Sequence, residues 1–499
     1  MASPYKRKRR RAPTALPISV PAPMGGWNTR DGLDMMPPED AVLLDNWIPG
    51  TSDVAVRSGY ASHATGMGSG NVDTLAEYHT GTTRNLIACA NGNIYDATGA
   101  PSSLGSGFSS NQWQVANFNG SLFLVNGTDA PQDYDGTTLS ATAWTGSGLT
   151  ISDLVGLNVF KTRLYFWEED SQDFWYAAPA GVTGTLTKFP LSRVGNFGGN
   201  LITMGTWTHD GGSGVDDHAV FIMSSGDVIV YQGSDPGDAA DWSLVGVYRI
   251  GVPLGVRGVA KVGGDLMIMT TDDYVSLSQV LVTGQLGSAS KLSGAVVAAS
   301  DNSSLFGWQV IIDRKKELLL FNVPVSATEF DQHVINVLTG AAGRLKDIPA
   351  RCWTSFNGDL YFGSTDGAIY KMTGSTDAGA SVNADGRASW TSFGTPTRKR
   401  VTAARPILSS TGLVDYAFGI GSDFADALTP APATVTPVSS PWDISPWDTS
   451  PWSAEFVVGV GWIVASANGQ TISPRLKIST KEPVSWLRTD YRIESGTNL

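Results

Sequence analysis

Short apolar and aromatic runs alternate with polar turns along most of this chain, from about residue 60 to residue 390. The turns are rich in Gly, Asn and Asp, which best accept the positive φ angles of tight hairpin turns. In the clearest cases, Asn119-Gly120 precedes the run Ser121–Val125 and Asn357-Gly358 precedes Asp359–Gly363. Further runs are Asn91–Tyr95, Arg163–Trp167, Gly226–Tyr231, Gly264–Met269, Glu317–Phe321 and Asp366–Tyr370. The pattern therefore predicts successive hairpins of short strands.

The runs recur at irregular intervals, mostly of several tens of residues, which is the spacing of four-stranded sheets repeated around a propeller. We predict an all-β chain with a β-propeller-like body over residues 61–394, without a fixed number of blades. A tandem of β-sandwiches is the structural alternative. The one helix that the pattern favours spans Pro38–Trp47, where proline and acidic residues occupy the first turn.

Both ends of the chain differ from this body. Residues 1–24 are basic and then proline-rich, which predicts an extended N-terminal arm of polyproline type, and residues 25–60 are expected to join the arm to the body. Residues 395–499 return to strand alternation and predict a C-terminal β-rich region. This region contains a five-residue Ser-Pro-Trp repeat, whose prolines forbid a helix and remove ladder donors, so we expect it to be extended.

Composition excludes several classes of protein. Hydrophobic residues make up 41% of the 499 residues, enough for a sizeable core, while charged residues make up 16% against a typical value of about 25%. Long disordered or coiled-coil segments are therefore not expected. The chain has no run of about 18 apolar residues that would predict a membrane-spanning helix. Four prolines within residues 12–23 argue against a secretory signal there.

The charge of the chain is unevenly distributed. Removing the six positive charges of an unbroken basic run, residues 6–11, from the net charge of −12 leaves −18 for the remainder. Such an acidic body is a poor non-specific binder of nucleic acid, because attraction to phosphates needs Lys and Arg at the contact surface. The basic run is suited to phosphates or to an acidic partner, although a solvated tail is the simpler interpretation at a terminus.

The residues predict no enzymatic activity, no cofactor and no metal site. The five histidines are scattered, and none has the spacing of a His-Glu-x-x-His zinc site: His63, His79, His209, His218 and His333. Asp210, Asp216, Asp217 and His218 lie in a Gly-rich loop and suggest a calcium or zinc site, but solvated loop acids explain them more simply. Glu168, Glu169 and Asp170 suggest a pair of glycosidase carboxylates, but adjacent acids point apart in a strand, so a turn at a strand end is favoured. Cys89 and Cys352 are too few for a disulfide framework.

The three tryptophans of the Ser-Pro-Trp repeat admit two interpretations. They provide either a stacking platform for carbohydrate or a cover for an apolar sheet or subunit boundary. We favour the boundary, since Trp is enriched at the energetic centres of interfaces. The candidate interface residues are Trp442, Trp447 and Trp452 of the repeat, together with Lys6, Arg7, Lys8, Arg9, Arg10 and Arg11 of the basic run.

A set of segments past residue 24 also carries a family resemblance. They are Gly25–Asp31, Met36–Ala41, Leu44–Pro49, Val56–Tyr60, Cys352–Tyr370, Ala404–Leu408, the Ser-Pro-Trp repeat with its aspartates, and Trp486–Tyr491. Together they are similar to segments of virion proteins from short-tailed bacteriophages, namely the tail nozzle or tail tubular protein B class.

The resemblance implies a structural role without catalytic residues or cofactors. Members of this class are β-propeller-based subunits that form a hexameric ring below the portal and the head-to-tail adaptor ring. The ring builds the distal DNA-ejection channel, retains and gates the genome, and contacts tail fibres, spikes or a needle. We thus expect a protein of the virion tail, assembled in the host cytoplasm, past which genomic DNA moves without sequence-specific binding. An acidic wall suits such a channel because it repels phosphates.

Two other functions stay open on the sequence alone. One is a carbohydrate-binding adhesin or a glycosidase on a β-propeller, because the same fold hosts many functions. The other is a tail collar that attaches fibres without gating DNA.

Overall fold

The computed structural model describes residues 16–210, 215–283, 290–412, 414–425, 431–435, 457–459 and 461–495. Its regular secondary structure is nearly all β-strand, with only short helices, which confirms the predicted all-β class. The chain divides into two compact units, each described below by itself. Unit 1 combines the N-terminal residues through Arg57 with those from Ala380 onward, and unit 2 spans Ser58–Gly379.

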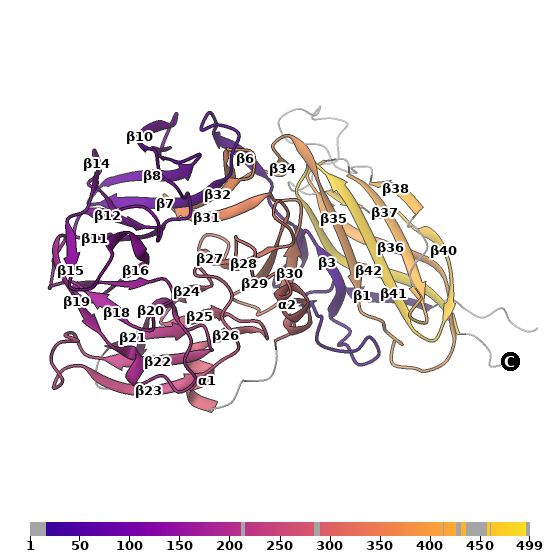
Figure 1. The fold of residues 1–499 in the computed structure, drawn as a ribbon. Coiled ribbons are helices and arrows are strands. Elements are labelled where there is room, and N and C mark those ends of the chain that lie inside the picture. Colours follow the sequence, from indigo (N-terminus) through magenta and orange to yellow (C-terminus); the bar gives the residue numbers. More distant parts are fainter. Residues whose placement is uncertain are drawn as a thin grey trace, which may run out of the picture. The chain divides into compact units, whose positions relative to one another are not determined.

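The described residues of unit 2 form seven small sheets, here called blades 1 to 7 in chain order (Figure 1). Blade 1 has β7 (Val72–Thr80), β8 (Thr83–Ala90), β9 (Asn93–Asp96) and β10 (Ser102–Ser106). Blade 2 has β11 (Gln114–Phe118), β12 (Ser121–Val125), β13 (Gln132–Tyr134) and β14 (Leu139–Ala141). Blade 3 has β16 (Leu154–Phe160), β17 (Arg163–Glu168), β18 (Phe174–Tyr176) and β19 (Gly184–Phe189), with β15 (Trp144–Gly146) parallel to β19. The short 3₁₀ helices Ile151–Asp153 and Leu191–Arg193 flank this blade.

Blade 4 has β20 (Leu201–Asp210), β21 (Val215–Met223), β22 (Asp227–Gln232) and β23 (Ser243–Arg249). Blade 5 has three strands, β24 (Val259–Val262), β25 (Asp265–Met269) and β26 (Tyr274–Ser276), followed by α1 (Leu277–Thr283) and α2 (Ser293–Ser300). Blade 6 has β27 (Gln309–Asp313), β28 (Leu318–Pro324), β29 (Phe330–Asn336) and β30 (Ala342–Leu345). Blade 7 has β31 (Ala350–Phe356), β32 (Asp359–Ser364), β33 (Ile369–Met372) and β6 (Tyr60–Ala64), with β34 (Thr376–Asp377) parallel to β6.

The blades close into a ring. Their first strands contact one another in the order β7, β11, β16, β20, β24, β27 and β31, and β31 contacts β7 again. Blade 7 takes its fourth strand from the start of the unit, because β6 pairs antiparallel with β33. The two ends of unit 2 therefore lock the same blade, and the body is a seven-bladed β-propeller.

The apolar runs of the sequence follow from this geometry. The interior strands of a blade are covered on both faces by neighbouring blades, so their residues are buried almost without alternation. Examples are β12, β17, β22, β28 and β32. Asn-Gly turns precede two of these strands, β12 and β32, and have positive φ at both residues, 51° and 76° at Asn357-Gly358, as hairpin turns of type I′ require.

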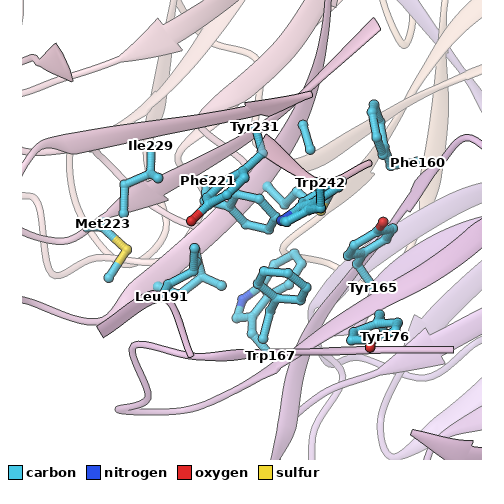
Figure 2. Packing of buried hydrophobic residues seen from close by; sticks show 14 residues of the cluster. Phe160, Tyr165, Trp167, Tyr176, Leu191, Phe221, Met223, Ile229, Tyr231 and Trp242 are labelled. Atoms are coloured by element: carbon cyan, nitrogen blue, oxygen red, sulfur yellow. The ribbon is translucent and has the colours of Figure 1, made fainter. Parts of the chain in front are cut away.

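Aromatic side chains fill the space between successive blades. Blades 3 and 4 share a cluster in which Phe174 stacks on Phe221 at a ring-centroid distance of 4.6 Å and Tyr231 stacks on Trp242 at 5.1 Å (Figure 2). Each buried aromatic ring contributes a large apolar area, and paired rings add about 0.5–1.5 kcal/mol beyond that area. The many aromatic side chains of the chain thus hold neighbouring blades together by packing between them.

Unit 1 contains two mainly antiparallel sheets. In the first, β42 (Val484–Ser495) pairs with β1 (Leu16–Pro21), β5 (Val54–Val56) and β36 (Lys399–Ser410). In the same sheet, β4 (Trp47–Pro49) pairs with β5, while β39 (Val457–Gly459) and β40 (Ile463–Gly469) pair with β36. The second has the order β2 (Gly26–Trp27), β3 (Asp40–Asp45), β35 (Ala380–Ala388), β41 (Ile472–Thr480), β37 (Val414–Ser422) and β38 (Ala431–Val435).

The prediction of a helix over Pro38–Trp47 is wrong. Residues Asp40–Asp45 form β3, which pairs with β35, a strand more than 300 residues later in the chain. Buried Asp40 accepts a hydrogen bond from the Asn28 side chain at 2.8 Å instead of capping a helix. Tertiary pairing thus overrides the local helix signal, as it often does for short segments.

The N-terminal arm is extended where the structure describes it. Residues Leu16–Pro21 lie along β42 in register from Leu16↔Ile493 to Pro21↔Arg488. Its prolines are accommodated because β1 pairs on one side only. Within the described residues, no helix has the length and apolar character needed to cross a membrane.

Candidate functional site

The interface residues singled out by sequence lie outside the described part of the chain. This holds for Trp442, Trp447 and Trp452 of the repeat and for Lys6–Arg11 of the basic run. Their proposed contacts stay predictions.

Three of the acidic and imidazole groups considered in the sequence analysis, Glu168, Asp170 and His333, have local structural partners. Glu168 accepts a hydrogen bond from Trp175 Nε1 at 2.9 Å, and Asp170 accepts one from Asn200 at 2.8 Å. His333 is bonded through Nδ1 to the Tyr274 hydroxyl at 2.8 Å. No group of three or more His, Cys, Asp or Glu side chains suited to a metal ion occurs among the residues described.

The two cysteines are buried free thiols in unit 2. Burial raises the pKa of both, that of Cys352 to about 12, so neither is a thiolate near neutral pH. The Sγ atom of Cys352 lies 3.3 Å from the carbonyl oxygen of Val72, where blade 7 meets blade 1. The thiols therefore pack the core instead of serving as nucleophiles.

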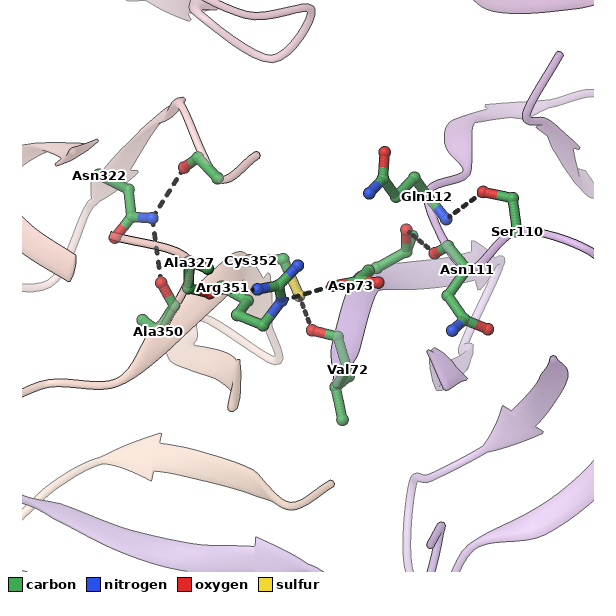
Figure 3. Close-up of polar contacts among 12 residues, drawn as sticks. Val72, Asp73, Ser110, Asn111, Gln112, Asn322, Ala327, Ala350, Arg351 and Cys352 are labelled. Atoms are coloured by element: carbon green, nitrogen blue, oxygen red, sulfur yellow. Dashed lines mark hydrogen bonds and ion pairs between the residues drawn. The ribbon is translucent and has the colours of Figure 1, made fainter. Parts of the chain in front are cut away.

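A cluster of charged side chains gathers at the mouth of the propeller where the innermost strands begin. Arg351, near the start of β31, pairs with Asp73 of β7 through a 2.5 Å contact from Nε to Oδ1 (Figure 3). Both side chains are about 10% exposed or less. The Arg351 Nη1 group also donates to the carbonyl oxygen of Ala327 at 2.9 Å. This ion pair joins the last blade to the first.

Arg257 reaches across the ring at the same mouth. It precedes β24 of blade 5, yet its guanidinium donates to the Asp73 carbonyl oxygen at 2.8 Å, to Thr74 Oγ1 at 2.8 Å and to the Trp113 carbonyl oxygen at 2.7 Å. These acceptors belong to blade 1 and to the approach to blade 2. All three are neutral, and burial lowers the pKa of Arg257 from its usual value. One side chain thus ties opposite blades together.

A pocket of about 350 Å³ opens beside the two arginines and is called the mouth pocket below. Its lining comes from the approaches to β11 and β24, the segment before β27, and β31: Gln112, Gly255–Arg257, Ser303–Gln309 and Arg351. The ring of Phe306 lies 5.5 Å from the Arg257 guanidinium and 5.1 Å from that of Arg351. The site is concave, partly apolar and positively charged.

A buried amide network holds the wall of the mouth pocket. Asn322 donates to the carbonyl oxygen of Gly307 at 2.8 Å and to that of Ala350 at 3.0 Å (Figure 3). It also accepts a hydrogen bond from Trp353 Nε1 at 2.9 Å. Gln309 exchanges two hydrogen bonds with the backbone of Trp353. These contacts join blade 6 to blade 7 and fix the segment that carries Phe306.

Sequence reasoning did not identify this site. Asp73, Arg257 and Arg351 are far apart in the chain and form no motif, and only ring closure brings them together. A partial signal was present, because Arg351 interrupts the apolar strand Ala350–Phe356 and Arg257 stands between glycines in a largely apolar stretch. Charged residues in such surroundings are rarely buried without a specific partner.

Comparison with known proteins gives weak likenesses only. No family model matches the chain, and no curated protein does. The solved structure of BBS1N in complex with ARL6DN is similar at a TM-score of 0.40 and 9% identity, covering 65% of this chain and 100% of that one. PorZ, a surface component essential to the type-IX secretion system of Porphyromonas gingivalis, is similar at a TM-score of 0.37 and 11% identity, covering 80% and 56%. We base no functional inference on these two likenesses.

Proposed function

We propose that this chain is a structural subunit of the tail nozzle of a short-tailed bacteriophage. In this proposal, six copies form a ring that builds the distal DNA-ejection channel and retains the genome until infection. The ring sits below the adaptor ring and contacts fibres, spikes or a needle. The protein belongs to the virion, assembles in the host cytoplasm and catalyses no reaction.

One observation carries the proposal. The segments that resemble the nozzle class come from both ends of the chain, and three of them contribute to one sheet of unit 1. These are Leu44–Pro49 through β4, Ala404–Leu408 through β36 and Trp486–Tyr491 through β42. Within Trp486–Tyr491, Trp486 is opposite Val54 of β5, and its ring centroid lies 6.1 Å from that of Trp47. The same strand pairs with Ala404–Leu408 of β36. The resemblance therefore falls on mutually packed residues, which is what a shared fold requires.

The architecture also suits a load-bearing ring subunit. Blades joined by aromatic clusters are stiff, and the ion pair of Arg351 with Asp73 closes the propeller. Arg257 spans the mouth of that ring, so a path for duplex DNA has to run between copies of the chain. Closed rotational symmetry supplies such an axis.

The mass of the assembled protein tests the proposal. We would measure it by native mass spectrometry on the full chain, alone and co-expressed with the portal and adaptor proteins of a short-tailed phage. The proposal predicts six copies, alone or on the adaptor. A monomer in both preparations would contradict it, and a monomer that binds glycans would favour the adhesin alternative. A ring that assembles but leaves DNA freely released would favour the collar.

A further inference from the structure

The mouth pocket holds more positive charge than the protein neutralises. Two guanidinium groups, those of Arg257 and Arg351, line it. Among the described residues, the carboxylate of Asp73 pairs with Arg351, and the contacts of Arg257 are all to neutral acceptors. The described lining residues include no Asp or Glu. A pocket of about 420 Å³ elsewhere in unit 2 differs, since it is lined by Glu329, Asp331 and Asp347 beside one lysine. The mouth pocket is therefore the more positive of these two pockets.

The two guanidiniums also have unused donors. Each guanidinium has five N–H groups in a planar fork. The contacts of Arg257 engage three of these groups and those of Arg351 engage two, so both side chains keep donors for a further acceptor. The bonds already formed hold both forks in place, which lowers the entropic cost of binding a ligand.

We propose that the mouth pocket binds an oxyanion, namely a phosphate or carboxylate group on a small molecule, between Arg257 and Arg351. Both anions match the donor geometry of a guanidinium fork, and a charge-assisted bond is about twice as strong as a neutral one. The pocket volume lies within the range of about 300–1,000 Å³ usual for small-ligand sites. The rings and aliphatic groups of Phe306, Leu305 and Val256 are suited to the uncharged part of the ligand. This inference does not depend on the tail nozzle proposal.

Ser304 offers a way to test the site without removing an arginine that holds the blades. It lines the pocket, is exposed, and makes no hydrogen bond among the described residues. Ser304→Glu places a negative charge beside the two guanidiniums, while Ser304→Gln adds similar bulk without charge. Thermal unfolding of both variants without ligand checks that the fold is intact.

Isothermal titration calorimetry on the full chain, with inorganic phosphate and separately with acetate at constant ionic strength, measures binding. We expect saturable binding of one anion per chain, weakened at least tenfold in Ser304→Glu and nearly unchanged in Ser304→Gln. Binding of phosphate alone assigns a phosphate ligand, and binding of both anions assigns the wider class. Absence of saturable binding of either anion, or equal affinity in the two variants, would overturn the proposal.

Discussion

At the scale of single residues, the buried charges of unit 2 determine how the propeller closes. Asp73 has two roles, since its carboxylate pairs with Arg351 and its backbone carbonyl accepts from Arg257. A buried ion pair adds little net stability, but loss of one partner leaves a charge in a low-dielectric site. The energetic importance of Asp73 is therefore greatest when it alone is changed.

Asp73→Asn should lower the free energy of unfolding by about 3 kcal/mol, because Arg351 keeps its charge without the carboxylate. Urea denaturation measures the change. Arg84→Gln, which removes a more exposed ion pair with Glu77, is the matched control and should cost at most about 1 kcal/mol. Equal effects of the two substitutions would show that the Asp73 pair is not buried in solution.

The lowered pKa of buried His333 makes the stability of the protein depend on pH. Burial, with a smaller contribution from the charge of Arg344, lowers its pKa to about 3, whereas an unfolded histidine titrates near 6.5. The folded imidazole stays neutral while the unfolded one gains a proton, so this stabilising contribution is complete above the unfolded pKa and is lost as the pH falls below it. Between about pH 6 and pH 4 the wild type should lose about 1.4 kcal/mol more per pH unit than His333→Gln. Parallel pH profiles from chemical denaturation would contradict this assignment.

At the scale of elements, the seam between blades 7 and 1 is packed too closely to accept added volume at Gly363. A Cβ atom on Gly363 of β32 would lie 2.6 Å from Val72 Cγ1 and 2.8 Å from Cys352 Sγ. Because this core is already close-packed, the neighbours have to shift.

Gly363→Ala should therefore destabilise the protein by about 1–3 kcal/mol, which a lower midpoint of thermal unfolding would report. Gly99→Ala is the control, since a Cβ there meets nothing within 4 Å, and its effect should stay within about 0.5 kcal/mol. A neutral Gly363→Ala would mean that the seam is looser than described.

The elements also show what the sequence can and cannot predict. The hairpins were predictable because a turn such as Asn357-Gly358 forms from local sequence alone, since Asn and Gly accept the positive φ angles that it requires. The number of blades was not predictable, since the described residues of blade 5 form three strands instead of four and blade 7 takes β6 from the other end of the unit. The site at the mouth was missed for the same reason, because no local pattern records that Asp73, Arg257 and Arg351 become neighbours.

At the scale of the whole molecule, the N-terminal residues allow the role of a strand in the fold to be tested separately from the role of the basic run in the proposed assembly. Residues 16–21 form β1 on the sheet of unit 1, whereas the basic run lies before them. A deletion of residues 1–24 removes both the strand and the charges, and a deletion of residues 1–15 removes the charges alone.

The shorter deletion should leave the thermal stability of the protein nearly unchanged, while weakening binding to an acidic neighbouring ring or to the DNA end. Sedimentation at two salt concentrations measures binding of both chains to the adaptor ring. Higher salt should weaken binding of the wild type, because it screens the charges of the basic run. Adaptor binding and salt dependence equal to those of the full chain would remove the basic run from the interface.

The Ser-Pro-Trp repeat supplies the last prediction. Changing Trp442, Trp447 and Trp452 to Ala should weaken ring formation or docking by about 2 kcal/mol or more if these residues are an interface centre. Analytical ultracentrifugation across a concentration series measures the shift in the assembly equilibrium. An unchanged equilibrium together with lost saccharide binding would support the carbohydrate platform instead.

The tail nozzle proposal requires that DNA pass between copies of the chain and not through any single propeller. Single-particle cryo-electron microscopy of the assembled protein tests this most directly. The account predicts a six-fold ring whose axis is open or gated, with each propeller mouth spanned by Arg257. A stable monomer, or an assembly in which the continuous channel runs through the propeller of each subunit, would contradict it.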